Sequence, residues 1–353
     1  MGRDLAGEHS VGERLAGELL VGEYLAGERL AGERLVGERL VGERLVGERA
    51  ANERVAGKEA ADSVVGTGAD DRPGESPWCT SIDDLVAHIT DGACLAIGKE
   101  ETGVSIAATL ALIRKEVRGL HLVCLPVSGL QADLLIGAGC VTTVETSGIS
   151  LGEIGSAPCF SRALRARQVR VIDSTCPALY AGFQAAQKGI PFMPLRGILG
   201  SELVAHRDSW KVIDNPFAKG DPILVVEAIA PDFALFHARS ADRQGNVFLG
   251  RDRDGLLLAH ASRKALVTVE ALVDGDLLRD PRRNGATLPE LYVSALAAAP
   301  RGAAPLSFAG RYRQQAAFLE RYARHAVSDS GFRKVLDELL SMHSSAAASV
   351  GIR

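Results

Sequence analysis

The chain has 353 residues, of which 46% are hydrophobic but only 5% aromatic, a composition typical of an α/β protein rich in Ala, Leu and Val. Its formal net charge of −4 gives no electrostatic reason to expect binding to nucleic acid or to an anionic membrane surface. No apolar run reaches the roughly 18 to 20 residues that a transmembrane helix needs. The N-terminus also lacks the apolar segment of a secretory signal.

Residues 1–60 repeat with a period of five, as Val36-Gly37-Glu38-Arg39-Leu40 followed at once by Val41-Gly42-Glu43-Arg44-Leu45 shows. Five residues advance about 140° around an α-helix, so the leucines form no stripe. A glycine in every unit also costs about 1 kcal/mol in a helix interior. We expect a low-complexity tail, partly helical or disordered, that arose from a tandem DNA repeat, with an interaction tail as the alternative. Residues 61–80 are predicted to be a linker.

A helix is predicted to start after Ser81, because Ser81 and Asp84 have the spacing of a capping box and apolar residues share one helix face up to Ile89. Short β-rich runs then alternate with helical patterns, at residues 93–97, 120–125, 141–145, 169–172, 192–195, 223–226, 233–238 and 265–269. Apolar strands between helices indicate an α/β domain with a mainly parallel sheet and helices on both faces. Two helices are predicted to end this domain, at 81–340, and residues 341–353 are expected to be frayed.

Three motifs in this domain carry a family resemblance. Gly137–Val141 reads Gly-Ala-Gly-Cys-Val, Ala185–Leu203 contains Pro-Phe-x-Pro-x-Arg followed by Gly-Ser, and His237–Asn246 begins with His-Ala and ends with Gly-Asn. From residue 81 to 340 the sequence resembles the A (alpha) subunits of family I coenzyme A transferases, especially those of the glutaconate CoA-transferase type. It is also similar to related CoA-dependent ring-cleaving proteins of steroid breakdown.

The resemblance implies a CoA-transferase (NagB/RpiA-like) α/β fold that works with a separate B (beta) subunit. It implies that a glutamate from the B subunit, acting as nucleophile, attacks an acyl-CoA and that a glutamyl-CoA thioester then passes CoA to a carboxylic acid. The A subunit then shapes the acyl pocket and offers backbone donors to the thioester oxyanion. No catalytic nucleophile is expected in this chain, and coenzyme A is expected as a substrate and not as a tightly bound cofactor.

Two segments depart from the family pattern. Many A subunits carry a glycine-rich loop after the first strand, but here that loop keeps only one of those glycines and contains Lys99, Glu100 and Glu101. The segment 172–177 lacks the glutamate expected in the ring-cleaving relatives. Two alternatives therefore stay open: a subunit of a CoA-ester hydrolase or ring-opening heterodimer of the same fold, and a non-catalytic assembly subunit.

The candidate contacts to substrate and CoA follow predicted strands, where α/β proteins bind ligands. The loop 98–103 is one such place, unless it is an ordinary loop whose acids favour the helix dipole. Ser128 and Gly129 either approach a thioester or cap the next helix. Arg196 can bind a carboxylate, unless it pairs with an acid such as Glu202. The predicted contacts are Gly98, Lys99, Glu101, Ser128, Gly129, Arg196, Gly200 and Ser201.

Other polar residues are expected to have structural roles. Ser105 lacks the second glycine of a nucleophile elbow and is assigned to the first turn of a helix. Asp242–Asn246 is predicted to be a turn between two strands. The six cysteines have no CxxC spacing; most of them indicate buried thiols of a reducing cytoplasm, and Cys176 is also expected to be a buried, inert thiol. The eight histidines form no metal-binding pattern. The acids nearest the expected site, none with a partner at diagnostic spacing, are Glu100, Glu101, Glu145 and Glu153.

Overall fold

A computed structural model of the chain describes residues 77–79, 81–100, 102–308 and 310–349, with side chains up to residue 343. The predicted repeat tail at 1–60, and the predicted linker apart from residues 77–79, lie outside the described residues. No described helix is both long and apolar enough to cross a membrane.

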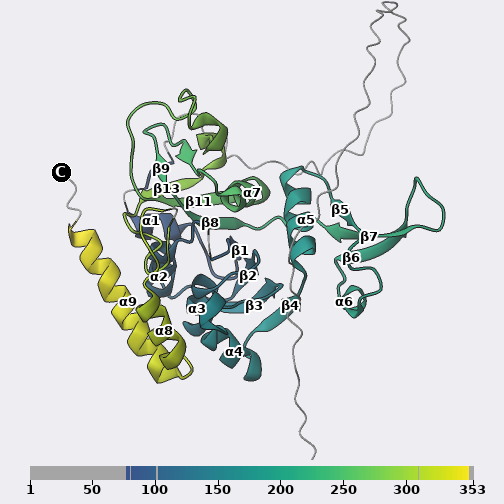
Figure 1. Ribbon diagram of the computed structural model, residues 1–353, viewed down its shortest axis with the longest axis horizontal. Coiled ribbons are helices and arrows are strands. Elements are labelled where there is room, and N and C mark those ends of the chain that lie inside the picture. The colour runs from purple at the N-terminus through teal and green to yellow at the C-terminus, as the bar shows by residue number, and fades with distance from the viewer. Residues whose placement is uncertain (1–76, 80, 101, 309, 350–353) are drawn as a thin grey trace, which may run out of the picture. The chain divides into compact units, whose positions relative to one another are not determined.

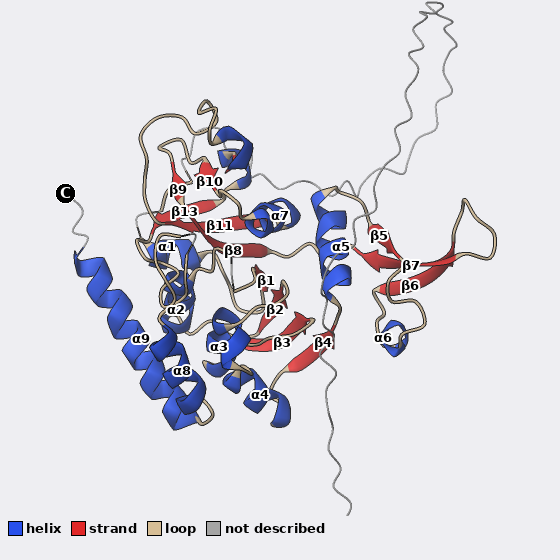
Figure 2. Cartoon of the chain, in the orientation of Figure 1, coloured by secondary structure: helices blue, strands red, loops and turns tan. Residues whose placement is uncertain are grey.

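The centre of the described structure is a seven-stranded sheet in which every neighbouring pair of strands is parallel (Figures 1 and 2). This confirms the predicted α/β fold with a mainly parallel sheet. The inner strands are almost entirely buried because helices cover both of their faces. In spatial order the strands are β13 (Ala295–Ala298), β11 (Lys264–Val269), β8 (Phe233–Ala238), β1 (Cys94–Ile97), β2 (Leu120–Cys124), β3 (Val141–Thr146) and β4 (Arg170–Asp173).

The helices divide between the two faces of this sheet. One face is covered by α1 (Ile82–Ala87), α2 (Ile106–Arg114), α3 (Leu130–Gly137) and α4 (Pro158–Arg165). The other is covered by α5 (Cys176–Gln187) and α7 (Arg253–Ala261). The Ser81 side chain accepts a hydrogen bond from the Asp84 N–H, which confirms the predicted cap of α1.

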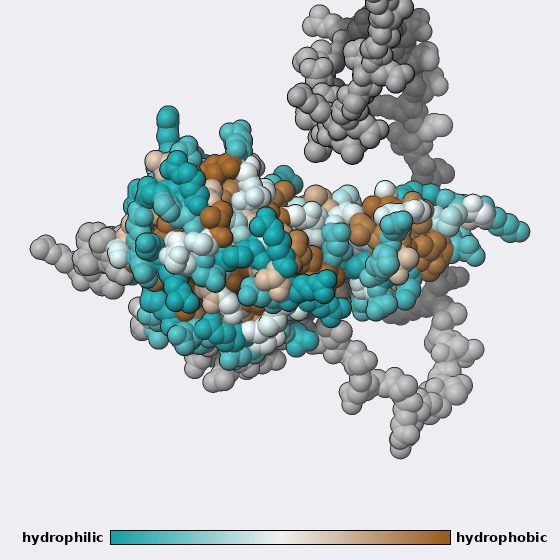
Figure 3. All heavy atoms as spheres, turned by 90° about the horizontal axis from the view of Figure 1, so that it is seen from below, coloured by the Kyte–Doolittle hydropathy of each residue, from teal (hydrophilic) through white to brown (hydrophobic). Residues whose placement is uncertain are grey.

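A second sheet has antiparallel strands in the order β5 (Phe192–Leu195), β7 (Pro222–Glu227) and β6 (Trp210–Asp214), with the short helix α6 (Glu202–Ala205) beside it. The predicted runs at 192–195 and 223–226, which we expected in the main sheet, therefore form β5 and β7 of a separate sheet. The run in β6 is not predicted because four of its five residues are exposed. Hydrophobic side chains gather on the surface over this sheet (Figure 3), and the exposed ones include Phe192, Val212, Ile213 and Phe217.

A third, small sheet consists of β9 (Ser240–Ala241), β10 (Val247–Phe248) and β12 (Thr287–Leu288). The carboxylate oxygen Oδ1 of Asp242 accepts hydrogen bonds from the N–H groups of Gln244, Gly245 and Asn246, and Gly245 has φ +101°. The predicted turn is thereby confirmed. Three 3₁₀ helices complete the regular structure of the described residues, at Gly152–Ile154, Asn284–Ala286 and Glu290–Tyr292.

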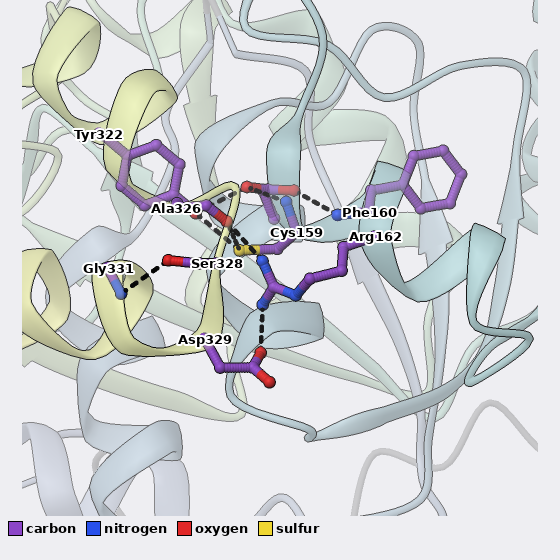
Figure 4. Close-up of polar contacts among 9 residues, drawn as sticks. Cys159, Phe160, Arg162, Tyr322, Ala326, Ser328, Asp329 and Gly331 are labelled. Atoms are coloured by element: carbon purple, nitrogen blue, oxygen red, sulfur yellow. Dashed lines mark hydrogen bonds and ion pairs between the residues drawn. The ribbon is translucent and has the colours of Figure 1, made fainter.

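The two C-terminal helices, α8 (Ala316–His325) and α9 (Asp329–Ser349), pack on α2 and α3, and the buried carboxylate of Asp133 holds α8. Asp133 accepts hydrogen bonds from the N–H groups of Cys159 and Phe160 at the start of α4 and from the Tyr322 hydroxyl in α8. Figure 4 shows these three partners, together with Arg162 and its contact to Asp329. The sequence predicted a frayed end from residue 341, whereas α9 continues to Ser349. One reason is that the His343 side chain donates a hydrogen bond to the Ala304 carbonyl oxygen, at 2.8 Å.

Candidate functional site

The order of the strands singles out one position at the carboxyl edge of the main sheet. β1 lies between β2 and β8, and the sheet grows from β1 toward β4 on one side and from β8 toward β13 on the other. In open α/β sheets, ligands bind outside the carboxyl ends of the strands where the order reverses in this way. The loop after β1, which contains predicted site residues, lies at this position.

This loop is pinned to the end of β8 by a close backbone approach. The Gly103 carbonyl oxygen accepts a hydrogen bond of 2.7 Å from the His237 N–H, and a Cβ on Gly103 would lie 1.6 Å from the His237 carbonyl oxygen. Only glycine fits there. On the side toward β2, the Ser128 hydroxyl donates to the Gly98 carbonyl oxygen at 2.8 Å. The structure thus brings Gly98, Ser128 and Gly129 together, while Glu101 lies outside the described residues.

Glu100 caps helix α3 in place of a side chain of that helix. Its Oε2 accepts a hydrogen bond of 2.9 Å from the Leu130 N–H, and the N-cap residue Gly129 makes no side-chain cap. A Cβ on Gly129 would lie 2.5 Å from the same oxygen. Burial raises the pKa of Glu100 to about 7 against the lowering effect of the Leu130 hydrogen bond. A carboxyl group that changes charge near neutral pH therefore lies at the candidate site.

Lys99 points across the loop toward the first turn of α7. Its Nζ lies 3.7 Å from Oδ2 of Asp254, and the side chains of the two residues are 35% and 10% exposed. The Tyr180 hydroxyl of α5 donates to Oδ1 of Asp254 at 3.1 Å. Burial, followed by the nearby charge of Asp254, raises the pKa of Tyr180. Residues of three elements thus converge beside the switch point.

A buried polar network lies next to this loop and joins β8 to β11. The fully buried His237 ring lies 2.9 Å from the Thr268 hydroxyl through Nδ1 and 2.8 Å from Glu270 Oε1 through Nε2. The Tyr312 hydroxyl donates to the same Glu270 oxygen at 2.6 Å. Burial alone would raise the pKa of Glu270, but hydrogen bonds from His237, Tyr312 and the Arg301 N–H lower it overall.

Sequence reasoning missed the roles of Glu270 and Tyr312 because their partners are distant in the chain. Ser105, whose hydroxyl lies 2.7 Å from the Thr268 hydroxyl, is the N-cap residue of α2, one position before its first turn.

Arg196, Gly200 and Ser201 lie apart from these residues, around the antiparallel sheet. Both terminal nitrogens of Arg196 bond to the Asp221 carboxylate, at 2.5 and 2.6 Å, and its side chain is 63% exposed. Asp221, and not Glu202, is the acid that pairs with Arg196. Gly200 has φ +80°, and the Ser201 hydroxyl accepts from the Leu203 N–H at the start of α6. The structure therefore does not bring the two groups of predicted site residues together.

A cavity of about 220 Å³ lies between the main sheet and the antiparallel sheet. Its wall includes Glu145, which the sequence placed among the acids near the site. Glu145 Oε1 is bonded to Nη2 of Arg207 at 2.5 Å, and both side chains are buried. The Arg207 guanidinium also stacks over the Trp210 ring, at 4.7 Å. Glu145 thus ties the two sheets together and is not free to act at the carboxyl edge.

The cysteines correct one expectation. Cys124, Cys140 and Cys159 are buried as predicted, but Cys176 is exposed at the start of α5, with Sγ 3.3 Å from the Ser147 hydroxyl. The prediction of a buried thiol at this position is wrong, because α5 begins at the surface. Within the described residues, no group of three or more His, Cys, Asp and Glu side chains could hold a metal ion.

Comparisons with known proteins agree with this architecture. The family model for coenzyme A transferase matches residues 79–284. The A subunit of 3-oxoadipate CoA-transferase from Pseudomonas knackmussii is 30% identical over 259 residues, which cover 71% of this chain and 89% of that protein. An uncharacterized protein of Archaeoglobus fulgidus is 29% identical over 73% of this chain, and the match spans 58% of its own length.

Solved structures extend the same result. Glutaconate coenzyme A-transferase from Acidaminococcus fermentans aligns with a TM-score of 0.71 at 25% identity, covering 78% of this chain and 93% of that one. The decarboxylase AibA/AibB aligns with a TM-score of 0.66 at 30% identity, covering 75% of this chain and 98% of that one. The match of the family model over more than half of the sequence shows that this chain belongs to the coenzyme A transferase family.

Proposed function

We propose that this chain is the A subunit of a heteromeric CoA-transferase, which moves coenzyme A between an acyl-CoA and a carboxylic acid. In this proposal the nucleophilic glutamate belongs to a separate B subunit. The family membership supports the assignment, as does the similarity to the A subunits of two CoA-transferases. The acyl-CoA and the acid are substrates, and coenzyme A is carried between them without a further bound cofactor.

One observation carries the assignment of the nucleophile to another chain. Among the described residues around the switch point, four carboxylates each have at least one oxygen held by a hydrogen bond, and the unbonded Oδ2 atoms of Asp252 and Asp254 are buried. Glu100 caps α3, Asp252 caps α7, Asp254 binds Tyr180 and Lys99, and Glu270 binds His237 and Tyr312. A nucleophilic carboxylate needs an oxygen that can reach the thioester carbon. We therefore expect the nucleophilic carboxylate to come from a second chain.

The proposed chemistry then divides between the two chains. The partner's carboxylate attacks the acyl carbon and releases the CoA thiolate, which attacks the resulting anhydride at the glutamyl carbon. The first acid leaves, and a glutamyl-CoA thioester remains for the acceptor acid. This chain contributes the wall of the site: the loop 98–103 and the segment at Ser128 and Gly129. Its backbone N–H groups and Lys99 are the donors for oxyanion and carboxylate groups.

The test uses this chain purified alone and together with a co-expressed B subunit. We expect transfer of CoA from acetyl-CoA to a panel of short carboxylic acids only by the complex. Borohydride should then reduce the glutamyl thioester, and mass spectrometry should find the modified glutamate in the partner. A reduced glutamate in this chain, or full activity of this chain alone, would overturn the proposal.

A second candidate is a different reaction of a CoA thioester on the same fold, such as hydrolysis, ring opening or decarboxylation. It is favoured by the 30% identity to a decarboxylase structure. The same complex, supplied with an acyl-CoA and no acceptor acid, separates the two. Release of free acid or of CO₂ without an acceptor identifies the second candidate, whereas a strict need for the acceptor identifies the transferase.

A further inference from the structure

We propose that Asp254 and Tyr180 are positioning residues that hold the Lys99 ammonium at the carboxyl edge of the sheet, where Lys99 binds an anionic group of a substrate. The inference rests on the proposed function, because that function supplies the anions. These are the phosphates of an acyl-CoA and the carboxylate of an acid, and one ammonium can bind either.

The Asp254 carboxylate needs a positive partner. The residue is only 7% exposed, and a carboxylate removed from water is costly unless it is paired and hydrogen-bonded. Oδ1 accepts the hydrogen bond from Tyr180, but Oδ2 is buried and has no hydrogen-bond partner in the described part of the chain. The Lys99 ammonium, 3.7 Å away, is the cation within 4 Å of Oδ2 there. Asp254 thus draws Lys99 to one side of the loop.

Lys99 keeps the capacity to bind a second group. An ammonium has three N–H donors, and the one buried oxygen of Asp254 does not use them all. The Lys99 side chain is 35% exposed, so part of it still faces solvent. It extends from the loop after β1, beside β8, where the order of the strands reverses and ligands of open α/β sheets bind. A free lysine would lose rotamer freedom on binding an anion, and Asp254 has already restricted it.

The competing interpretation is a structural latch. A Lys99–Asp254 pair also ties the loop after β1 to α7, and loss of a latch lowers thermal stability without changing substrate affinity. Positioning has the opposite signature, because the affinity for an anionic substrate falls while the fold and the rate of the chemical step stay the same. Affinity measurements therefore separate the two.

The experiment compares Lys99→Met, Asp254→Asn, Tyr180→Phe and the double variant Lys99→Met/Asp254→Asn in the assembled complex. Calorimetry with coenzyme A and with pantetheine, which lacks the phosphates, gives Kd. Kinetics with the acid that the wild-type complex uses best gives KM and kcat. The matched controls are Lys219→Met, on the exposed 215–221 loop, and Asp83→Asn, which breaks the exposed pair with Arg114.

If Lys99 holds a phosphate, Lys99→Met and Asp254→Asn should each raise Kd for coenzyme A about tenfold and leave Kd for pantetheine unchanged. If it holds the carboxylate, the same variants should raise KM for the acid about tenfold at unchanged kcat. In both cases the double variant should be no worse than Lys99→Met, Lys99→Arg should recover most of the affinity, and Tyr180→Phe should have a smaller effect.

Unchanged affinity for both anions, with or without a lower melting temperature, would overturn the positioning role. An inactive wild-type complex is a different result. It would contradict the proposed transferase, while the coenzyme A titrations would still report on Lys99.

Discussion

The carboxyl edge of the main sheet and the antiparallel sheet both hold residues predicted to bind substrate, but they differ in how those residues are packed. At the edge, Lys99 and Ser128 have buried or half-buried partners from other elements, and Gly103 touches the backbone of β8. Around the antiparallel sheet, Arg196 forms an exposed pair, and Gly197 and Gly200 have open space where a Cβ would be.

The difference shows that a family motif and a ligand site need not coincide. The Ala185–Leu203 run carries much of the family resemblance, yet the structure assigns its arginine to an exposed contact with Asp221. Buried ionisable groups, which are costly unless they are paired or used, gather instead at the switch point and between the two sheets. Four substitutions test this contrast, and the effects we expect decrease from the first to the last.

Gly103→Ala should be the most disruptive. Its new Cβ would lie 1.6 Å from the His237 carbonyl oxygen, so the loop after β1 must leave the end of β8. We expect a loss of stability of about 4 kcal/mol or more, together with loss of activity. Gly197→Ala is the matched control near the antiparallel sheet, since nothing lies within 4 Å of its Cβ position. Thermal melts measure the melting temperatures of both variants. Equal values for Gly103→Ala and Gly197→Ala would contradict the described packing of the loop on β8.

Arg207→Met should follow, because it leaves the buried Glu145 carboxylate without its ionic partner. The expected cost in unfolding free energy is about 3–5 kcal/mol. Replacing both partners, as Arg207→Met/Glu145→Met, should restore much of the stability, since two apolar side chains leave no unpaired charge. Denaturant titration measures both variants. A double variant as unstable as the single one would show that the ion pair does not join the sheets in this way.

Glu100→Gln should change how stability depends on pH. The pKa of Glu100 is about 7 in the folded chain against 4.5 ordinarily, so the folded state binds this proton more tightly than the unfolded state. The resulting stabilisation is complete below about pH 4.5 and is lost as the pH rises through 7. Glutamine avoids that loss, so at pH 8 the variant should melt on the order of 5–10 °C above the wild type. The control Glu153→Gln, at an exposed position, should melt at the wild-type temperature at pH 8.

Arg196→Ala should have the smallest effect on stability, because the pair with Asp221 is exposed and screened by solvent. We expect no measurable change in melting temperature. The effect of Arg196→Ala on KM for the acid substrate shows which of the two regions binds the substrate carboxylate. An increase larger than that of Lys99→Met would locate carboxylate binding at the antiparallel sheet. An unchanged KM would leave Arg196 with the surface contact alone.

Much of the fold follows from local sequence patterns. The strands β1, β2, β8 and β11 match predicted runs because buried parallel strands are nearly continuous in apolar residues. β3 and β4 also match predicted runs, although β3 contains polar residues and β4 has no fully buried residue. Among the strands that no predicted run matches, β6 is mostly exposed, β12 has only two residues, and β13 reads Ala-Leu-Ala-Ala, without a β-branched residue. That β5 and β7 form a separate sheet depends on pairing with β6, which no local pattern reports.

The candidate site was predictable only where it depends on chain order. Gly98, Lys99, Ser128 and Gly129 follow strands, and the carboxyl ends of parallel strands meet at one edge. The side chains that complete their surroundings come from distant positions, such as Tyr180 and Asp254. The packing of α5 and α7 on the sheet brings Tyr180 and Asp254 together. Their spacing in the sequence and the composition of the chain therefore do not predict this contact. The raised pKa of Glu100 is likewise a property of burial.

The central position of β1 also affects how the chain acquires its structure during synthesis. Leu95 of β1 pairs with Phe233 of β8, 138 residues later. At about 5–20 residues per second, a ribosome needs on the order of 10 s to make the intervening chain. During that time one edge of β1 has no strand beside it, and such an edge can pair with another molecule. The pairing of β1 with β8 in the middle of the sheet therefore forms late. This topology is expected to fold slowly, and the nascent chain needs protection from pairing with other molecules until then.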